Sequence, residues 1–247
     1  MVKERYFYVE GDRIGAGRIR LSDDESHHLA RVIRLQEGAV ITLLDGRGNL
    51  YKARIVSFSA SMAELEVVER ERAEPPRRID LALAVTKAHC MDTAVEKCTE
   101  IGLRRIIPFR STRSVWRGGD REAARKRDRL SRKVIAACKQ SGHPYFPDVA
   151  EVGDFDNLCD RISSYGTVFL ADRKRGGGGF AAAGTVSEPV LCIVGPEGGL
   201  DEHEIGKLTG LGAVPVSLGL FRLRSETAAI CAVFLVHTIL SSGGSIR

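Results

Sequence analysis

The sequence contains no hydrophobic run near the roughly 20 residues that a helix needs to span a bilayer. Its first fifteen residues, MVKERYFYVEGDRIG, include no apolar core of the kind found in signal peptides. The sequence also lacks a strong excess of one charge, because 37 Lys and Arg are nearly balanced by 32 Asp and Glu, which leaves a net charge of +5. These absences argue against an integral membrane protein, a secreted protein and a fibrous protein. The small basic excess permits a polyanionic partner without requiring one.

The six cysteines form no C-x-x-C pair and no Cys/His cluster with the spacing of a zinc site. Cys192 lies in the apolar stretch VLCIV and Cys231 in AAICAVFLV. Such positions are typical of small buried thiols in a reducing compartment. We therefore expect a cytoplasmic protein with no metal.

The chain has 247 residues, of which 43% are hydrophobic, enough for one large domain or two small ones. Up to about residue 72 the pattern favours short strands separated by turns such as DGRGN, and one helix over residues 22–35. Ser22 is the expected N-cap of that helix, with Glu25 completing a capping box. Several short strands in succession predict a small β-barrel. The expected strands cover residues 5–9, 17–21, 39–44, 50–58 and 63–68.

The segment ERAEPPRR, residues 71–78, cannot continue a helix or a central strand, and it predicts a domain boundary. We divide the chain into residues 1–72 and 73–247. The second part alternates strands with helices, which predicts an α/β domain with a mostly parallel sheet and helices on both faces. Gly176–Gly179 is expected to be a mobile loop. The expected strands cover residues 79–85, 105–109, 166–170, 190–194 and 213–216, and helices end near Gly102 and span 120–140.

Two segments of this second part combine a buried strand with polar residues at its carboxyl end, where α/β sheets bind ligands. The first is VLCIVGPEGGLDEHEI, in which Asp201 and Glu204 predict a capped helix after a glycine-rich turn. It matches neither the phosphate-binding G-x-x-x-x-G-K-[ST] loop nor G-x-G-x-x-G. The pattern fits a functional loop and an ordinary tight turn equally well.

The second segment, residues 214–240, has a short strand, a turn at Gly219, a polar cluster and an apolar helix. A cluster held between two rigid elements is well placed for a site. The alternative is that Ser225 caps the helix and Arg224 pairs with Glu226. A basic stretch, residues 117–133, carries eight basic and three acidic residues, which suits either phosphate contacts or a solvated helix.

Five blocks of the sequence, in order, resemble a known family. HHLARVIRLQEGAVITLLDGRGNLYKARI resembles an N-terminal RNA-binding PUA-like barrel, while EKCTEIGLRRIIPFRSTRSV, AACKQSGHPYFPDV, IVGPEGGLDEHEI and SLGLFRLRSETAA are similar to the family's later motifs. The chain thus resembles the bacterial 16S ribosomal RNA (uracil-N3)-methyltransferases of the SPOUT class. It departs from their pattern at His143, Thr112 and Asp148, at Leu220 and Phe221 with an arginine at Arg222 instead, and at Ser225.

The resemblance implies a PUA-like β-barrel over residues 1–72 and a SPOUT domain with a C-terminal trefoil knot over residues 73–247. It also implies S-adenosylmethionine as cofactor, small-subunit ribosomal RNA as partner, no membrane, and a homodimer. The residues implied to line the cofactor pocket are Gly195, Glu197, Gly198, Leu218, Gly219, Leu223, Arg224 and Thr227.

For chemistry, N3 of uridine must lose its proton before it attacks the methyl group. A nearby arginine would favour the anionic base, since an opposite charge lowers a pKa. We hypothesise that Arg224 has this role, with Arg113 as second choice, and that Glu226 orients the arginine or accepts the proton. RNA contacts are predicted for His28, Arg31, Arg34 and Arg113, with the basic helix.

Three other functions stay open from the sequence. One is a SPOUT methyltransferase acting on another ribosomal site or on transfer RNA. A second is an RNA-binding protein without catalysis. A third, a nicotinamide-dependent oxidoreductase, matches the α/β rhythm but lacks the glycine fingerprint.

Overall fold

The computed structural model describes residues 5–59, 62–114, 116, 118–177, 179–180 and 184–243. The chain forms two compact units. The first comprises residues 1–75 and 135–146, and the second residues 76–134 and 147–247. The first unit thus ends its main segment between Pro75 and Pro76, within the ERAEPPRR segment, and it also takes in a distant stretch that the division at residue 72 did not include.

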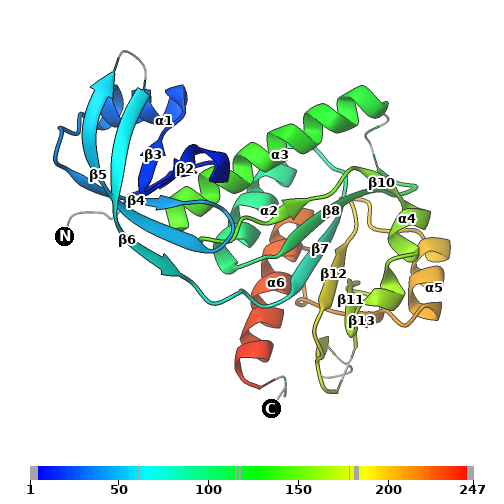
Figure 1. Cartoon of the computed structure of the whole chain (residues 1–247). Helices are drawn as coiled ribbons and strands as arrows, with labels where there is room; N and C mark the ends of the chain where they lie inside the picture. Colours follow the sequence, from blue (N-terminus) through cyan, green and yellow to red (C-terminus); the bar gives the residue numbers. More distant parts are fainter. Residues whose placement is uncertain are drawn as a thin grey trace. The chain divides into compact units, whose positions relative to one another are not determined.

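The first unit is built on one curled six-stranded sheet (Figure 1). Its strand order is β1-β4-β5-β6-β3-β2; β1 pairs with β4 in parallel, and the other pairs are antiparallel. Register shifts in the β5–β6 pair bend the two long strands, as bulges do. The strand predictions are confirmed. The strands are β1 Tyr6–Tyr8, β2 Ile14–Gly15, β3 Arg18–Arg20, β4 Val40–Leu44, β5 Asn49–Ser59 and β6 Met62–Arg72.

The predicted helix of this unit begins as expected and ends differently. Ser22 is the N-cap of α1, Asp23–His27, and its Oγ accepts a hydrogen bond from the Glu25 N–H at 3.4 Å. The helix then widens into a π-helical turn, His28–Ile33, and Arg34 adopts a left-handed backbone with φ 60°. The helix predicted over residues 22–35 is therefore confirmed up to Ile33, but its second half is π-helical.

Glu25 does not complete the expected capping box. Its carboxylate instead accepts a hydrogen bond from Lys139, near the end of the helix α3, Asp120–Ser141, and within the same unit. Only 11% of the Glu25 side chain is exposed, so Lys139 supplies an opposite charge to a carboxylate that is largely removed from water.

The DGRGN turn between β4 and β5 is covered by residues 142–146. The Gly48 N–H donates to the Pro144 carbonyl at 2.9 Å, and the Phe146 N–H donates to the Gly46 carbonyl at 3.0 Å. Gly46 and Gly48 have φ of 74° and 95°, and a Cβ at either would collide with an aromatic ring of the covering loop. Glycine is required here by both backbone conformation and space.

The second unit is a parallel seven-stranded sheet in the order β10-β8-β7-β12-β11-β13, with β9 also paired to β8. All its strand pairs are parallel. Every residue of β7 and β12 is buried, as expected for central strands covered on both faces. The strands are β7 Ile79–Ala84, β8 Arg105–Arg110, β9 Asp148–Val149, β10 Gly153–Asp154, β11 Thr167–Ala171, β12 Val190–Val194 and β13 Val214–Val216.

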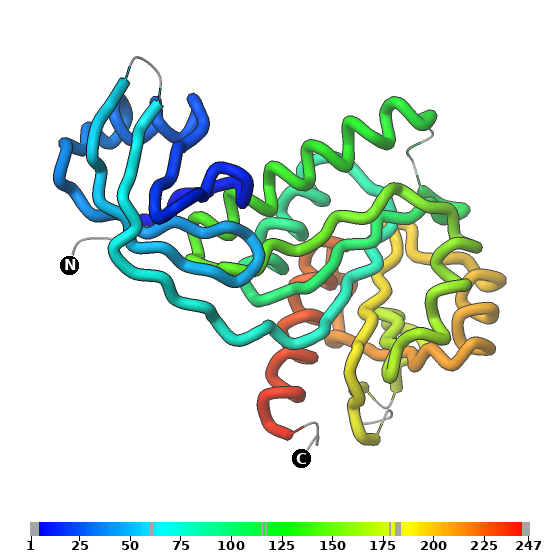
Figure 2. Tube along the Cα trace, in the orientation of Figure 1, coloured from blue at the N-terminus to red at the C-terminus, as the bar shows by residue number. Residues whose placement is uncertain are grey.

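Helices cover both faces of this sheet, which confirms the α/β prediction. α6, Ser225–Ser241, packs on β7 and β12 beside α2, Ala88–Ile101. The opposite face buries Ile107, Leu170 and Ile193 among side chains of α4, Phe155–Cys159, and α5, Glu202–Gly210. In the Cα trace, the chain passes from α5 through β13 and returns to the middle of the unit as α6 (Figure 2). α3 spans Asp120–Ser141.

A buried ion pair joins the amino ends of β7 and β8. Asp80 is fully buried, and Arg104 donates to both of its carboxylate oxygens at 2.8 and 2.7 Å. The Tyr165 hydroxyl donates to the same carboxylate at 2.7 Å. Burial, with the Asp80 carboxylate next, raises the pKa of Tyr165. These contacts satisfy a charge that would be costly to bury alone.

Within the described residues, no helix is both long enough and apolar enough to cross a bilayer.

Candidate active site

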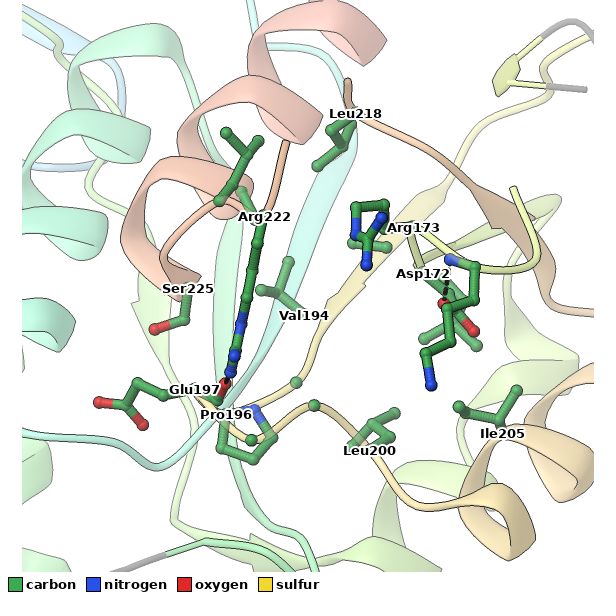
Figure 3. Close-up of a pocket in the computed structure, with 18 of the residues that line it drawn as sticks. Asp172, Arg173, Val194, Pro196, Glu197, Leu200, Ile205, Leu218, Arg222 and Ser225 are labelled. Carbon is green, nitrogen blue, oxygen red and sulfur yellow. Dashed lines mark hydrogen bonds between the residues drawn. The ribbon is translucent and has the colours of Figure 1, made fainter. Parts of the chain in front are cut away.

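A cavity of about 390 Å³ opens at the carboxyl ends of the parallel strands of the second unit (Figure 3). Three loops line it, following β11, β12 and β13, and Arg113, after β8, joins them. Asp172, Leu200 and Ile205 lie on one side of the cavity, and Glu197 and Ser225 lie on the other (Figure 3). Its volume falls in the range of small-molecule sites, roughly 300–1,000 Å³.

The loop after β12 is the GPEGG segment. A Cβ at Gly195 would lie 3.0 Å from the Leu200 main-chain nitrogen, so glycine allows the loop to fold back closely on itself. α5 then starts at a capping box in which Asp201 accepts from the Glu204 N–H at 2.7 Å and Glu204 from the Asp201 N–H at 2.9 Å. That first hydrogen bond lowers the pKa of Asp201. The predicted capped helix is confirmed.

Glu204 also holds the neighbouring loop. Its second carboxylate oxygen accepts a hydrogen bond from the Thr112 N–H at 2.8 Å, and the residue is 2% exposed. The next residue, Arg113, donates to the carbonyls of Gly198 and Leu200 at 3.0 and 3.3 Å. The loop after β8 is thereby fastened to the GPEGG loop at two points.

The loop after β13 forms another wall. Arg222 runs across the cavity and donates to the Glu197 carbonyl, so segments far apart in the sequence meet here (Figure 3). Leu218 and Leu223 contribute apolar surface. Phe221 also lines the cavity although 82% of it is exposed.

The loop after β11, with Asp172, Arg173, Lys174 and Arg175, was missed by the sequence analysis. Asp172 accepts from the Lys174 N–H at 2.8 Å and from Arg175 at 3.1 Å. The sequence does contain a signal for this loop, because the charged residues DRKR directly follow an apolar run of strand length, and strand ends are where ligands bind in α/β sheets. Gly176, expected to be mobile, is buried against Ser217, leaving no space for a Cβ, and Gly178 lies outside the described residues.

The start of α6 carries unpaired buried polar atoms. Its N-cap is Arg224, so the alternative that Ser225 caps the helix is wrong. Oγ of Ser225 and one carboxylate oxygen each of Glu197 and Glu226 are buried without a hydrogen-bond partner among the described residues. Arg224, 80% exposed at its side chain, lies 4.0 Å from Glu226. Burial, and then the Glu226 carboxylate, raise the pKa of Cys90 nearby.

The predicted site residues are thus only partly gathered at the cavity. Arg224, Glu226 and Thr227 begin α6 beside it without lining it. His28, Arg31 and Arg34 are exposed on the first unit, with His28 and Arg31 in the π-helical turn and Arg34 directly after it. The predicted residues that line the cavity are Gly195, Glu197, Gly198, Leu218, Gly219, Leu223 and Arg113.

The donor set of this region fits an organic ligand. Apolar walls alternate with carboxylates, guanidinium groups and the main chain of the glycine-rich loop, as in cofactor sites. Among the described residues, no three His, Cys, Asp or Glu side chains gather closely enough to hold a metal ion.

Comparisons with known proteins agree with this architecture. Residues 73–237 match the family model of an RNA methyltransferase domain, and residues 21–67 match an RNA methyltransferase PUA domain. The class defined by the fold and the cavity is therefore that of the RNA methyltransferases. Ribosomal RNA small subunit methyltransferase E of Bacillus subtilis is 31% identical over 86% of this chain and 87% of its own. The chain belongs to this ribosomal RNA small subunit methyltransferase E family.

Two solved structures extend the comparison. A ribosomal RNA small subunit methyltransferase E of Neisseria gonorrhoeae, bound to S-adenosyl methionine, is 28% identical with a TM-score of 0.84 and covers 96% of this chain and 98% of its own. A Legionella pneumophila protein solved with the bound cofactor SAM is 25% identical with a TM-score of 0.88 and covers 100% of both chains.

Proposed function

We propose that the protein is an S-adenosylmethionine-dependent methyltransferase that modifies N3 of a specific uridine in 16S ribosomal RNA of the small subunit. The observation that carries the proposal is the cavity, because the two loops that resemble the family's cofactor motifs meet across it, at the contact of Arg222 with Glu197. The cofactor bound in family structures supports the same conclusion. The first unit would act as a PUA-like RNA-binding barrel, and the second as a knotted SPOUT domain.

The cavity residues fit the cofactor in size and chemistry. Leu218, Leu223 and Val194 offer apolar surface for an adenine ring, and the main chain of Gly195 lines the same cavity. Carboxylates that could accept from ribose hydroxyls or face positive charge lie at Glu197 and at Asp172, which already accepts from the Lys174 N–H and from Arg175. When bound, S-adenosylmethionine supplies an electrophilic methyl group on a sulfonium.

The residues of the chain would handle the acceptor's proton. The Glu226 side chain is 11% exposed, and one of its carboxylate oxygens has no partner among the described residues, so it is available to accept the N3 proton. Arg224 is largely exposed and close to that carboxylate. It would stabilise the negative charge left on the base, since opposite charges favour ionisation. Arg113 would mainly hold the GPEGG loop, given its two hydrogen bonds to that loop.

We further propose that the enzyme is a cytoplasmic homodimer that pairs through α6. One side of this helix exposes Phe234, 57% exposed, with Leu235 and the partly exposed Cys231 nearby. These positions recur at helical spacing and form an apolar stripe that a second copy would cover.

The test is transfer of labelled methyl from S-adenosylmethionine to unmodified small ribosomal subunits, followed by nucleoside analysis. Labelled 3-methyluridine is the expected product. Label in another nucleoside would keep the class of enzyme and refute the acceptor. Label only in transfer RNA or large subunits would replace the substrate, and binding of RNA without any transfer would favour the non-catalytic alternative.

A further inference from the structure

Phe221 is an exposed aromatic at the edge of a cofactor-sized cavity. Among the described residues, it and Leu220 are the most exposed large hydrophobic side chains, at 82% and 88%. Scattered surface apolar residues need no explanation, but Phe221 also lines the cavity, and Leu220 does not. An aromatic ring in that position is available to an incoming ligand rather than to the protein core.

The same rim carries two cationic side chains that no described acidic residue pairs with. Asp172 turns its loop by accepting from the Lys174 N–H, and it also binds Arg175, which in turn reaches Glu202. The side chains of Arg173 and Lys174 are left exposed, with no hydrogen bond or ion pair to the residues that the structure describes. Arg173 extends into the cavity from its wall (Figure 3).

The charge balance indicates which ligand this rim would take. The cavity is lined by five cationic and three anionic side chains, an excess of two positive charges. S-adenosylmethionine carries a sulfonium, an ammonium and a single carboxylate, so its net charge is positive and it does not neutralise an excess of cations. The phosphates of a nucleic acid can neutralise these cations, since proteins commonly contact phosphate oxygens with Arg and Lys.

We propose that Phe221, Arg173 and Lys174 form a nucleotide clamp at the cavity rim, in which an unpaired base stacks on Phe221 while backbone phosphates contact the two cations. Aromatic stacking combined with cationic contacts to the backbone is how proteins hold single-stranded RNA. The clamp rests on the proposed function, because it takes the acceptor RNA as ligand. It assigns the RNA contact near the cofactor to a phenylalanine and to a loop outside the predicted RNA-binding residues.

The test measures binding of unmodified small ribosomal subunits, in the presence of S-adenosylmethionine and without need of turnover. Phe221→Leu should raise the Kd by roughly 5- to 150-fold, whereas Phe221→Trp, which keeps a stacking surface, should retain affinity. Leu220→Ala is the matched control, since it removes an equally exposed apolar side chain that does not line the cavity.

The cations are tested by salt dependence. Arg173→Gln with Lys174→Gln should reduce the slope of log Kd against log salt by about 0.7 for each phosphate that the protein no longer neutralises. Arg161→Gln, an exposed arginine before β11 at the opposite edge of the sheet, should leave the slope unchanged.

Three results would overturn the clamp. If Phe221→Leu binds RNA with unchanged affinity, no base stacks on Phe221. If Phe221→Leu has a lower molar mass in solution than the unaltered protein, Phe221 lies at a contact between two copies of the chain. Weaker S-adenosylmethionine binding by the glutamine variants without RNA would assign the cations to the cofactor carboxylate. Absence of 3-methyluridine with the unaltered protein is a separate result, which refutes the proposed acceptor.

Discussion

Glu204 joins two loops of the candidate active site, because its buried carboxylate accepts hydrogen bonds from both the Asp201 and the Thr112 main-chain N–H groups. Thr112 precedes Arg113, which binds the carbonyls of the GPEGG loop. Glu204 is therefore a positioning residue for the cavity wall, although it lies outside the cavity itself.

Glu204→Ala should lower the free energy of unfolding by about 1–3 kcal/mol, because two main-chain donors lose a charged acceptor. It should also weaken S-adenosylmethionine binding, since Arg113 is no longer held in place. Glu204→Gln keeps one acceptor oxygen, so its free energy of unfolding and its cofactor affinity should lie between those of the unaltered protein and of Glu204→Ala. Denaturant unfolding and equilibrium dialysis of the cofactor measure these effects. If Glu204→Ala binds the cofactor as tightly as the unaltered protein, the contact of Glu204 with Thr112 does not position the cofactor site.

Glu226→Gln tests the proposed proton acceptor. The amide keeps the shape of the side chain but cannot take a proton, so the single-turnover rate of methyl transfer should fall by roughly 100- to 10,000-fold. Cofactor affinity should be retained, because Glu226 does not line the cavity. Glu151→Gln, 89% exposed at its side chain, is the control. A wild-type rate in Glu226→Gln would transfer the role to another group.

Charge reversal at Arg31 and Arg34 tests the RNA surface of the first unit. Both side chains are exposed, and the double Glu variant should weaken binding of small subunits and flatten its salt dependence. Arg20→Glu is a suitable control, because Arg20 is already paired with Glu64 at 3.1 Å. If the salt slope stays the same in the double variant, these arginines make no phosphate contact.

Asp80→Ala should destabilise the protein by about 3–5 kcal/mol, because Arg104 and the Tyr165 hydroxyl would lose their buried anion. Asp148→Ala removes the exposed partner of the adjacent Arg105 and should cost less than about 1 kcal/mol. Urea unfolding compares the two. Equal losses would mean that burial does not govern these ion pairs.

Thiol labelling near neutral pH should be selective. Burial raises the pKa of Cys192 to about 12 and that of Cys138 to about 12, so both stay protonated and slow to react. Cys231 is the one cysteine of the six that is not buried, and it should be modified first. Mass spectrometry identifies the site, with Cys231→Ser as control. Protection of Cys231 at rising protein concentration would support pairing through α6.

Much of the fold was predictable because its signals are local. Apolar runs of strand length located β7, β12 and the other main strands of the second unit, and the Asp201–Glu204 spacing located the start of α5. The GPEGG and SLGLFRLRSET segments were also identified as site loops before any geometry. In each case, a few neighbouring residues contain the whole signal.

One missed feature depends on strand order, and two others depend on how a helix begins or continues. Asp172 to Arg175 belong to the cavity only because β11 lies between β12 and β13. Ser225 was an equally good N-cap on paper, yet the helix starts one residue earlier than that alternative requires. The π-helical turn after His27 also has no composition that marks it.

The interrupted make-up of the first unit bears on how the chain folds as it is synthesised. Residues 1–75 leave the ribosome first, but the loop that covers the DGRGN turn belongs to residues 135–146. The first unit can complete its packing only after residues 76–134 have been made. The order of synthesis and the order of completion therefore differ, and the amino-terminal unit finishes folding while the enzyme's other half is already emerging.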